Sequence, residues 1–455
     1  MKLKPYPKYR DSGIQWIGEI PEGWEVNRLK FLLSSLESGS RETGGGSQLD
    51  EGVFSLGGEH INWDGTLNLE NTKLISEEYY NSMNQGKLKI NDVLLVKDGA
   101  TIGKTAILTK KEFDKMAVNE HVFLMRSNKM INPKLLYYLI CSDSGFKQIK
   151  LTEVGSAQGG INQDFIAKAY FSIPQDKQDQ NAIANFLDKK NARIDALIEK
   201  DKRLIELLKE RRTALINHAV TKGLDPNVKL KDSGIDWIGE IPEGWDVIKI
   251  KHIAGSCSMP VQTGPFGAQL HADDYVNEGI PFILIRNVNH GKINNTNIPF
   301  VSEEDAERLF MYRLKADDIV FSRVGSLGRA ALVTNREEGW LISGQMLRLR
   351  LKDKRINRNY LVYLFQSKVS EEYVSYESVG STRESLNTEI LSNFISPLPP
   401  LPDQTAIANF LDQATSKIDK TIKLIEKKIK LLEEYKKSLI HYVVTGKIDV
   451  RGVEA

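Results

Sequence analysis

Apolar residues recur at helical spacing over two long, charged stretches of the chain. In the later stretch the apolar series advances by steps of three or four residues over five heptads, while Lys and Glu fill most other positions. Such spacing places the apolar side chains on one stripe of a long helix, as in the seam of a coiled coil. The series consists of Ile407, Leu411, Ala414, Ile418, Ile422, Ile425, Ile429, Leu432, Tyr435, Leu439 and Val443.

The earlier stretch carries a similar series, with Lys190, Asp201 and Arg211 as interruptions. Its apolar members are Ile183, Leu187, Ile194, Ile198, Ile205, Leu208 and Leu215. A helix of about 43 residues spans about 65 Å. Because neither helix is apolar all round, each needs a partner. We expect the two to pair as an antiparallel coiled coil that holds two domains apart. A coiled coil that only dimerises the protein is the alternative.

Two sequence blocks occur twice, at nearly the same separation. Residues 11–30 (DSGIQWIGEIPEGWEVNRLK) match residues 232–251 (DSGIDWIGEIPEGWDVIKIK) at 15 of 20 positions, with an offset of 221. The block QNAIANFLD at 180–188 returns as QTAIANFLD at 404–412, with an offset of 224. An internal repeat of this length indicates the overall architecture more directly than any local sequence pattern. The chain is therefore a duplication of one unit of about 220 residues, in which a mixed region precedes a helix.

The mixed regions combine short strands with helices. Asp92–Val96 and Asp318–Phe321 are β-rich runs that lead into glycine-containing turns, and helices are predicted at Pro133–Cys141 and Arg358–Gln366. Each region ends in a proline-bearing linker, which stops the previous element. The fold class is thus α+β, with two similar domains that each precede a long helix. The expected boundaries are 1–175 for the first domain, 176–225 for the central helical region, 226–400 for the second domain and 401–455 for the C-terminal helical region.

Composition narrows the class of protein. No apolar run approaches the length that crosses a bilayer, so we expect no membrane association. Two cysteines, Cys141 and Cys257, cannot form a disulfide framework and fit a cytoplasmic location, and neither has partners at metal-site spacing. The net charge is +2, but it is unevenly spread: residues 180–222 carry +4, residues 404–446 carry +3 and the remainder carries −5. Nucleic-acid binding by the mixed regions would therefore depend on local patches.

The search for catalytic motifs gives little. Gly99–Thr105 resembles a phosphate-binding loop, but only three residues separate its glycines where that loop needs four, and the second copy lacks the Lys and Thr. A glycine-rich turn between strands explains both copies better. It could still direct Lys97, Lys104, Arg323 and Arg329 at a polyanion. The sequence has no GxSxG, no HExxH and no Asn/Asp-Pro-Pro-aromatic tetrapeptide, so we expect no catalytic residues and no metal site in this chain.

Polar, glycine-punctuated loops with side chains suited to reading bases recur in both copies. Gly155–Asn162 corresponds to Gly380–Asn387, and the two share Gly-Ser and Asn while the residues between them differ. Gln and Asn can pair with adenine, and Arg with guanine. Ordinary surface turns remain the alternative. The candidates for DNA contact are Lys97, Thr101, Lys104, Gln158, Asn162, Gln262, Thr263, Arg286, Asn287, Arg323, Ser326, Arg329, Thr382, Arg383 and Asn387.

With these blocks the chain resembles the specificity subunit of type I restriction-modification systems. The resemblance rests on the WIGEIPEGW blocks at 16–24 and 237–245, on the Gln-x-x-Ile-Ala-x-Phe-Leu-Asp blocks after the proline linkers, and on TGPFGAQL at 263–270. It covers essentially the whole chain, in the order domain, helix, domain, helix.

The resemblance implies that each domain is a target recognition domain for one half of a bipartite site on double-stranded DNA. The helices would set the spacer and dock two methyltransferase subunits. S-adenosylmethionine, ATP and Mg would act on partner subunits, including restriction and translocation subunits, and this chain would hold no cofactor. The differing loops predict an asymmetric target. A non-enzymatic coiled-coil scaffold that binds protein partners, and a nucleotide-dependent enzyme that uses Lys104, are the rival hypotheses.

Overall fold

The computed structural model describes residues 4–42, 49–70, 73–154, 160–255, 257–265, 269–289, 291–323, 329–377 and 386–453. The chain divides into two compact units. Unit 1 comprises Met1–Asp201 and Lys427–Ala455, and unit 2 comprises Lys202–Glu426. Each unit therefore contains one mixed region, the beginning of the long helix that follows it and the end of the other long helix.

Unit 1 contains the first copy of the mixed region. Its strands are β1 (Tyr9–Asp11), β2 (Glu19–Pro21), β3 (Trp24–Arg28), β4 (Leu33–Ser38), β5 (Val53–Leu56), β6 (Leu74–Ile75), β7 (Val93–Val96), β8 (Thr105–Ile107), β9 (Met116–Val118), β10 (Val122–Ser127), β11 (Glu153–Val154), β12 (Gly160–Ile161) and β13 (Tyr170–Pro174). Its helices are α1 (Glu77–Ser82), α2 (Pro133–Cys141), α3 (Asp143–Leu151), α4 (Gln163–Lys168) and the first part of α5 (Lys177–Lys222).

Unit 2 repeats this order. Its strands are β14 (Leu230–Asp232), β15 (Glu240–Pro242), β16 (Asp246–Lys249), β17 (Val261–Thr263), β18 (Ile280–Ile283), β19 (Val288–Asn289), β20 (Lys292–Ile293), β21 (Phe300–Val301), β22 (Ile319–Ser322), β23 (Ala330–Leu332), β24 (Leu341–Ile342), β25 (Met346–Leu349) and β26 (Ile395–Leu398). Its helices are α6 (Ile250–Ile253), α7 (Glu303–Arg308), α8 (Arg358–Phe365), α9 (Lys368–Glu377), α10 (Thr388–Asn393) and the first part of α11 (Leu401–Val444).

The predicted α+β class is confirmed, and the two copies have matching sheets. A four-stranded antiparallel sheet has the order β4-β10-β7-β8 in unit 1 and β17-β25-β22-β23 in unit 2. A three-stranded sheet, β6-β5-β9 or β21-β18-β24, contains one parallel pair in each copy. The glycine-rich segment 97–104 joins antiparallel β7 to β8, as the turn interpretation predicted. Gly99 and Gly103 in this turn have φ of +81° and +93°, a region that favours glycine.

The proline linkers are themselves strands, which the sequence analysis did not foresee. β13 pairs with β3, so that Pro174 lies opposite Trp24, and β26 pairs with β16. The residues just after each WIGEIPEGW block are thereby tied to the residues just before each long helix. Trp24 and Trp245 of these blocks are buried, at 2% and 3% exposure. The repeated block is thus a structural anchor of each unit.

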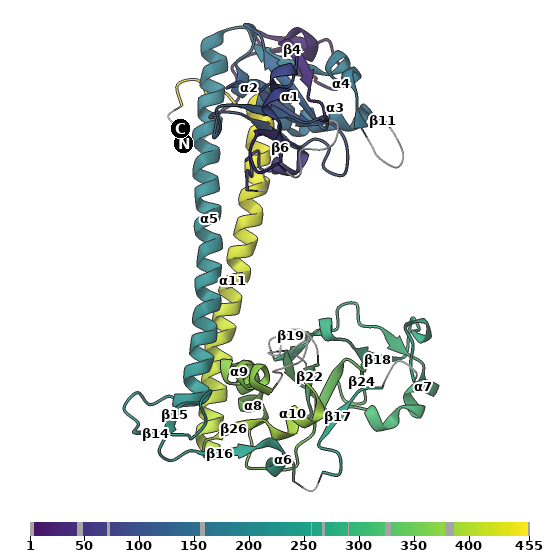
Figure 1. Ribbon diagram of the computed structural model, residues 1–455, viewed down its shortest axis with the longest axis vertical. Coiled ribbons are helices and arrows are strands. Elements are labelled where there is room, and N and C mark those ends of the chain that lie inside the picture. Colours follow the sequence, from purple (N-terminus) through teal and green to yellow (C-terminus); the bar gives the residue numbers. More distant parts are fainter. Residues whose placement is uncertain are drawn as a thin grey trace. The chain divides into compact units, whose positions relative to one another are not determined.

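Each hydrophobic core uses both long helices. In unit 1, Leu187 near the beginning of α5 and Val443 near the end of α11 are fully buried in one cluster. In unit 2, Leu411 of α11 and Val220 of α5 take the corresponding places. Within each unit the end of one helix thus lies against the beginning of the other, and the helices run antiparallel (Figure 1). This confirms the predicted antiparallel pairing.

A buried glutamine explains the second repeated block. Gln180 is 1% exposed; its Oε1 accepts a hydrogen bond from the backbone of Asn132 at 2.9 Å, and its Nε2 donates to the carbonyl of Pro174 at 2.8 Å. Gln404, also 1% exposed, makes the matching bonds to Asn357 at 2.8 Å and Pro399 at 2.8 Å. Each glutamine therefore fastens the first turn of a long helix to its own domain.

The apolar series predicted for helix pairing faces the interior. Eleven of its members in the two helices are buried: Ile183, Leu187, Ile194, Ile198, Ile407, Leu411, Ile418, Ile422, Ile425, Leu439 and Val443. Six are half-buried: Ile205, Leu208, Leu215, Ala414, Ile429 and Leu432. Complete burial of an aliphatic side chain of this size contributes about 1.5–3 kcal/mol, so the seam stabilises the pairing of the two helices within each unit.

Four positions of the predicted series need correction. Arg211 and Tyr435 are exposed, whereas their neighbours Arg212 and Lys436 lie in the seam, with side chains 11% and 16% exposed. In the same way Asn191, not Lys190, and Thr415, not Ala414, are the buried residues. The seam follows the strict alternation of four and three residues, which outweighs the hydrophobicity of single side chains. Asp201 is a true seam residue, at 7% exposure.

Candidate nucleic-acid interface

Three segments of unit 1 meet where β7 ends and β10 begins. The backbone N–H of Lys97 donates to the carbonyl of His121 at 3.0 Å, and the N–H of Ile161 donates to the carbonyl of Lys97 at 2.7 Å. We call Lys97, Asp98, His121 and Asn162 loop edge 1. The turn after β7, the residues before β10 and the start of α4 thus present polar side chains at one edge of the four-stranded sheet.

Unit 2 builds the same edge with different side chains. The N–H of Arg323 donates to the carbonyl of Gln345 at 2.9 Å, and the N–H of Leu386 donates to the carbonyl of Arg323 at 3.0 Å. We call Arg323, Gln345 and Asn387 loop edge 2. The two edges have a common backbone framework, since the strands that carry them pair in the same order. The chemistry at each position differs: Lys97 corresponds to Arg323, and His121 to Gln345.

Charges of both signs meet at loop edge 1. His121 Nδ1 lies 2.6 Å from Asp98 Oδ1, and His121 Nε2 lies 3.4 Å from Glu120 Oε1. Lys97 Nζ donates to Ser38 Oγ at 2.9 Å and lies 5.1 Å from the centroid of the Phe123 ring. These contacts hold the cation and the imidazole in place, and half of the His121 side chain remains exposed. Such an edge offers both donors and acceptors to a ligand.

The structure brings several predicted residues to these edges. Thr101 and Lys104 belong to the turn that begins at Lys97, and Arg329 is exposed at the far end of the matching turn in unit 2. The backbone bonds of both turns correspond: Val96 N–H donates to Lys104 at 2.9 Å, and Ser322 N–H donates to Arg329 at 3.1 Å. Four predicted residues lie outside the described ranges: Gln158, Ser326, Thr382 and Arg383.

Asn162 and Asn387 have a structural task at these edges. Asn162 Oδ1 accepts from the backbone of Asp164 at 2.7 Å and caps α4, and Asn387 Oδ1 accepts from Ile390 at 2.8 Å and caps α10. Asn is a preferred helix N-cap because its oxygen satisfies a free backbone N–H. This accounts for the presence of Asn in both copies of the loop while the residues between differ.

The remaining candidates lie on β17 and in a neighbouring turn. Thr263 is half-buried and lies next to loop edge 2, since it pairs with Leu347, two residues beyond Gln345; Gln262 beside it is buried. Asn287 is 1% exposed and holds its turn by bonds to Leu284 and Asn294, so its side chain faces the interior. Arg286 is exposed and donates to the carbonyl of Asn297 at 3.0 Å.

Sequence reasoning missed His121, Gln345 and Asp98. His121 and Gln345 each come directly before a buried strand, β10 or β25, and they are 224 residues apart. That is the offset of the second repeated block, so an alignment of the two copies would have paired them. Their sequence neighbours differ, and a lone His or Gln carries no motif of its own.

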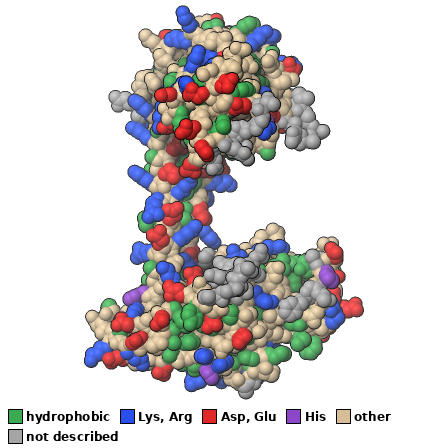
Figure 2. All heavy atoms as spheres, in the orientation of Figure 1, with side chains coloured by type: hydrophobic (Ala, Val, Ile, Leu, Met, Phe, Trp, Pro, Cys, Tyr) green, Lys and Arg blue, Asp and Glu red, His purple; other side chains and the backbone are tan. Residues whose placement is uncertain are grey.

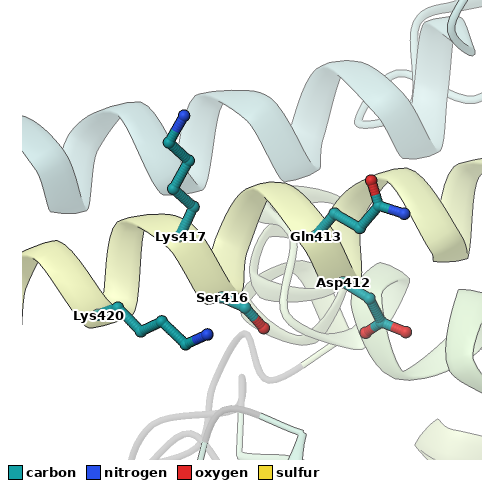
Figure 3. A pocket seen from close by; sticks show the side chains of 5 residues that line it. All are labelled: Asp412, Gln413, Ser416, Lys417 and Lys420. Atoms are coloured by element: carbon teal, nitrogen blue, oxygen red, sulfur yellow. The ribbon is translucent and has the colours of Figure 1, made fainter.

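Metal-ligating side chains are not clustered in the part of the chain that the structure describes. Its His, Cys, Asp and Glu residues form no group of three that could hold a metal ion. Burial raises the pKa of the Cys141 thiol to about 12, so this thiol stays protonated. A shallow hollow on α11 is lined by Asp412, Gln413, Ser416, Lys417 and Lys420, whose side chains splay to different sides of one helix (Figure 3).

The surface of the long helices mixes charges of both signs (Figure 2). None of the helices in the described ranges has the length together with the apolar character that crossing a membrane requires.

Comparison with known proteins agrees with this architecture. The model of the type I restriction modification DNA specificity domain matches residues 21–207 and again residues 242–434. The chain is 24% identical over 442 residues to the type I restriction enzyme MjaVIII specificity subunit of Methanocaldococcus jannaschii, covering 95% of each protein. It is 26% identical over 254 residues to the EcoBI specificity subunit of Escherichia coli, covering 54% of this chain and 51% of that protein.

Solved structures share the fold. A chain from a study of complex assembly and conformational transition of the type I restriction-modification system has a TM-score of 0.65 at 16% identity, covering 94% of this chain and 99% of that one. The HsdS subunit from Thermoanaerobacter tengcongensis has a TM-score of 0.50 at 16% identity, covering 94% and 98%. The two matched domains, the paired helices and these likenesses together show that the chain belongs to the type I restriction-modification DNA specificity family.

Proposed function

We propose that this chain is the DNA sequence-recognition subunit of a type I restriction-modification complex. The observation that carries the proposal is the loop edge, built twice on the same backbone framework but with different side chains. A framework that is kept while its side chains vary suits two readers of two different short sequences. Each domain would read one half of a bipartite, asymmetric site on double-stranded DNA.

Base contact would come from the accessible members of the two edges. In unit 1 these are Lys97, Lys104 and His121, and in unit 2 they are Arg323, Gln345, Arg329 and Thr263. Arg and Lys pair with guanine, and Gln pairs with adenine. The remaining contacts to phosphate would position the domains without carrying sequence information.

The long helices would set the spacer between the half-sites and dock two methyltransferase subunits. Exposed leucines outside the seam favour a protein partner: Leu424 is 68% exposed, Leu431 is 53% exposed and Leu207 is 46% exposed. Catalysis would belong to the partners, with S-adenosylmethionine on the methyltransferases and ATP and Mg on restriction subunits. The scaffold hypothesis explains the exposed leucines but gives no reason for two loop edges that share their backbone hydrogen bonds and carry different side chains.

Adenine methylation mapped across a genome tests the proposal. A host that expresses this chain with its methyltransferase partner should gain methylation at one bipartite, asymmetric sequence, and omission of the chain should abolish it. Methylation that is absent or independent of sequence would contradict DNA reading. A purified complex that assembles without protecting defined DNA sites would favour the scaffold.

DNA binding by the chain alone should be weak and sensitive to salt. The mixed regions together with the tail are acidic on balance, at −5, and phosphate attraction scales with the number of cations at the interface. The complex should bind much more tightly. Equal affinity of the chain and the complex would show that the partners add no phosphate contacts.

A further inference from the structure

The two long helices are related by the repeat, so each seam position of α5 has an equivalent 224 residues later in α11. Most equivalent positions hold similar residues: Leu187 corresponds to Leu411 and Ile198 to Ile422. Helices this similar could in principle pair like with like, α5 with α5 and α11 with α11 of a second copy of the chain. Some feature must favour α5 with α11.

Two of the ion pairs between the helices can form in every pairing and therefore do not favour α5 with α11. In unit 2, Arg212 Nε lies 3.2 Å from Asp419 Oδ1, and in unit 1, Lys436 Nζ lies 2.7 Å from Asp195 Oδ1. Lys436 is the equivalent of Arg212, and Asp419 is the equivalent of Asp195. These are one ion pair that occurs twice. Pairing α5 with α5 would match Arg212 with Asp195, and pairing α11 with α11 would match Lys436 with Asp419.

A third ion pair can form only when α5 pairs with α11. In unit 1, Lys428 Nζ lies 2.8 Å from Asp201 Oδ2 and donates to Oδ1 at 3.0 Å, while the Asp201 side chain is 10% exposed. The residue equivalent to Asp201 is Ile425 and the residue equivalent to Lys428 is Leu204, both apolar. Only α5 against α11 can therefore form the pair. In a pairing of α5 with α5, each Asp201 would face the partner's Leu204.

We propose that the Asp201–Lys428 ion pair selects α11 as the partner of α5 and rejects the α5 helix of a second copy of the chain. A buried carboxylate that loses its cation is strongly destabilising, whereas the same group with its partner is tolerated. A single polar seam residue can fix the pairing of a coiled coil in this way.

The ion pair also disfavours the pairing of α11 with the α11 helix of a second copy, although the seam of α11 is apolar at the position equivalent to Asp201. Each chain carries one helix of each kind, so two copies that joined their α11 helices would leave two α5 helices to pair with each other. That pairing would bury two Asp201 carboxylates without Lys428. The device acts on chain association and does not rest on the proposed reading of DNA.

The test is co-expression of two full-length chains with different affinity tags, followed by tandem purification and native mass spectrometry. Asp201→Ile installs the residue found at the equivalent position 425 and leaves exposed Lys428 in place. It should raise the yield of mixed-tag dimers at least about tenfold over the unsubstituted chain, because the buried unpaired charge is gone. A mixed-dimer yield for Asp201→Ile equal to that of the unsubstituted chain would overturn the proposal.

Two further variants control the experiment. The exchanged pair Asp201→Lys with Lys428→Asp keeps the discrimination, since the substituted, charged position 201 would again face Leu204 in a pairing of α5 with α5. It should give few mixed dimers, and a yield equal to that of Asp201→Ile would overturn the proposal. Asp195→Asn with Asp419→Asn weakens ion pairs that every pairing can form. Mixed dimers from this variant at the Asp201→Ile level would likewise reject selection by Asp201.

Discussion

Arg350 holds Asp318 through two parallel hydrogen bonds, Nε to Oδ1 at 2.7 Å and Nη2 to Oδ2 at 2.6 Å. The Asp318 side chain is 1% exposed, and its hydrogen bonds raise the pKa of the Arg350 guanidinium. Arg126 and Asp92 form the equivalent pair in unit 1, where Glu37 also binds the guanidinium. Gln262 occupies the place of Glu37 in unit 2, since Glu37 pairs across the sheet with Leu124 and Gln262 with Arg348.

This difference predicts unequal effects of one substitution in the two copies. Asp318→Asn should destabilise unit 2 by about 1–3 kcal/mol, because it leaves the half-buried Arg350 guanidinium without its carboxylate. Asp92→Asn should cost unit 1 less, since Glu37 still neutralises Arg126. Amide hydrogen exchange of β22 and β7 in the two variants measures the local stability. Equal losses would mean that Glu37 does not compensate.

We expect Gln404 to stabilise the beginning of α11 more than a polar residue in the first turn of a helix usually does. Gln404→Ala leaves buried backbone groups of Asn357 and Pro399 without partners, which costs about 1–3 kcal/mol for each group. We expect faster hydrogen exchange at the beginning of α11 and in β26. Asn409→Ala, at an exposed position in the next turn of α11, is the control and should change exchange little. Similar exchange in both variants would argue against the clamp.

These side chains show where sequence reasoning succeeds and where it stops. The heptads, the β-rich runs at Asp92–Val96 and Asp318–Phe321, and the turn at Gly99 follow from local patterns and were predicted; the strands observed are Val93–Val96 and Ile319–Ser322. The hydrogen bonds of Gln180 were not predicted. Its partner Asn132 is distant in sequence, and its partner Pro174 lies in a segment that the sequence analysis interpreted as a linker.

The same limit applied to the seam and to the loop edges. Thr415 and Lys436 take seam positions because the four-three alternation continues through polar residues, so hydrophobicity alone chose the wrong neighbours, Ala414 and Tyr435. His121 and Gln345 reach their edges only through backbone bonds to Lys97 and Arg323. Loop placement of this kind depends on tertiary hydrogen bonds, which no local pattern reports.

His441 should make the end of α11 sensitive to acid. Burial, then the nearby Lys147 and Lys447, lower its pKa, and Asp143 opposes them. Because the pKa of His441 is lower in the folded state than in the unfolded chain, the unfolded state binds more protons in acid. The stability that is present above the unfolded-state pKa is therefore lost as the pH falls through the folded-state pKa. Amide protection factors at the end of α11, which correct for the slower intrinsic exchange in acid, should fall as the pH drops below about 6.5, the ordinary pKa of histidine.

Substitution separates this effect from general acid sensitivity. His441→Gln should flatten the pH dependence, whereas His218→Gln, at the equivalent end of α5, should leave it unchanged. A pH dependence that persists in His441→Gln would assign it to other groups.

We expect the long helices to set the distance between the two DNA half-sites without affecting which bases are recognised in each half-site. One heptad inserted within Ile194–Leu215 of α5, matched by one within Ile418–Leu439 of α11, keeps the seam in phase and lengthens the pair by about 10 Å. Under the proposed function the spacer in the methylated site should grow by about three base pairs, at about 3.4 Å each. The half-sites should stay the same. Altered half-site bases would refute this division of labour.

The loop edges should determine one half-site each. His121→Gln gives loop edge 1 the side chain that loop edge 2 has in Gln345, and it removes the imidazole held by Asp98. Under the proposed function, methylation mapping should show altered bases in a single half-site. A change in one base contact is worth about 1–3 kcal/mol of discrimination, or roughly tenfold to a hundredfold in preference.

The reciprocal variant completes the comparison, because Gln345→His should alter only the other half-site. Lys73→Ala removes an exposed lysine of unit 1 that pairs with Glu59, and it serves as a control for loss of charge away from the edge. If His121→Gln and Lys73→Ala give the same methylated sequence, His121 does not read a base. If both His121→Gln and Gln345→His change the same half-site, each edge does not read its own half, and the assignment of one domain to one half-site fails.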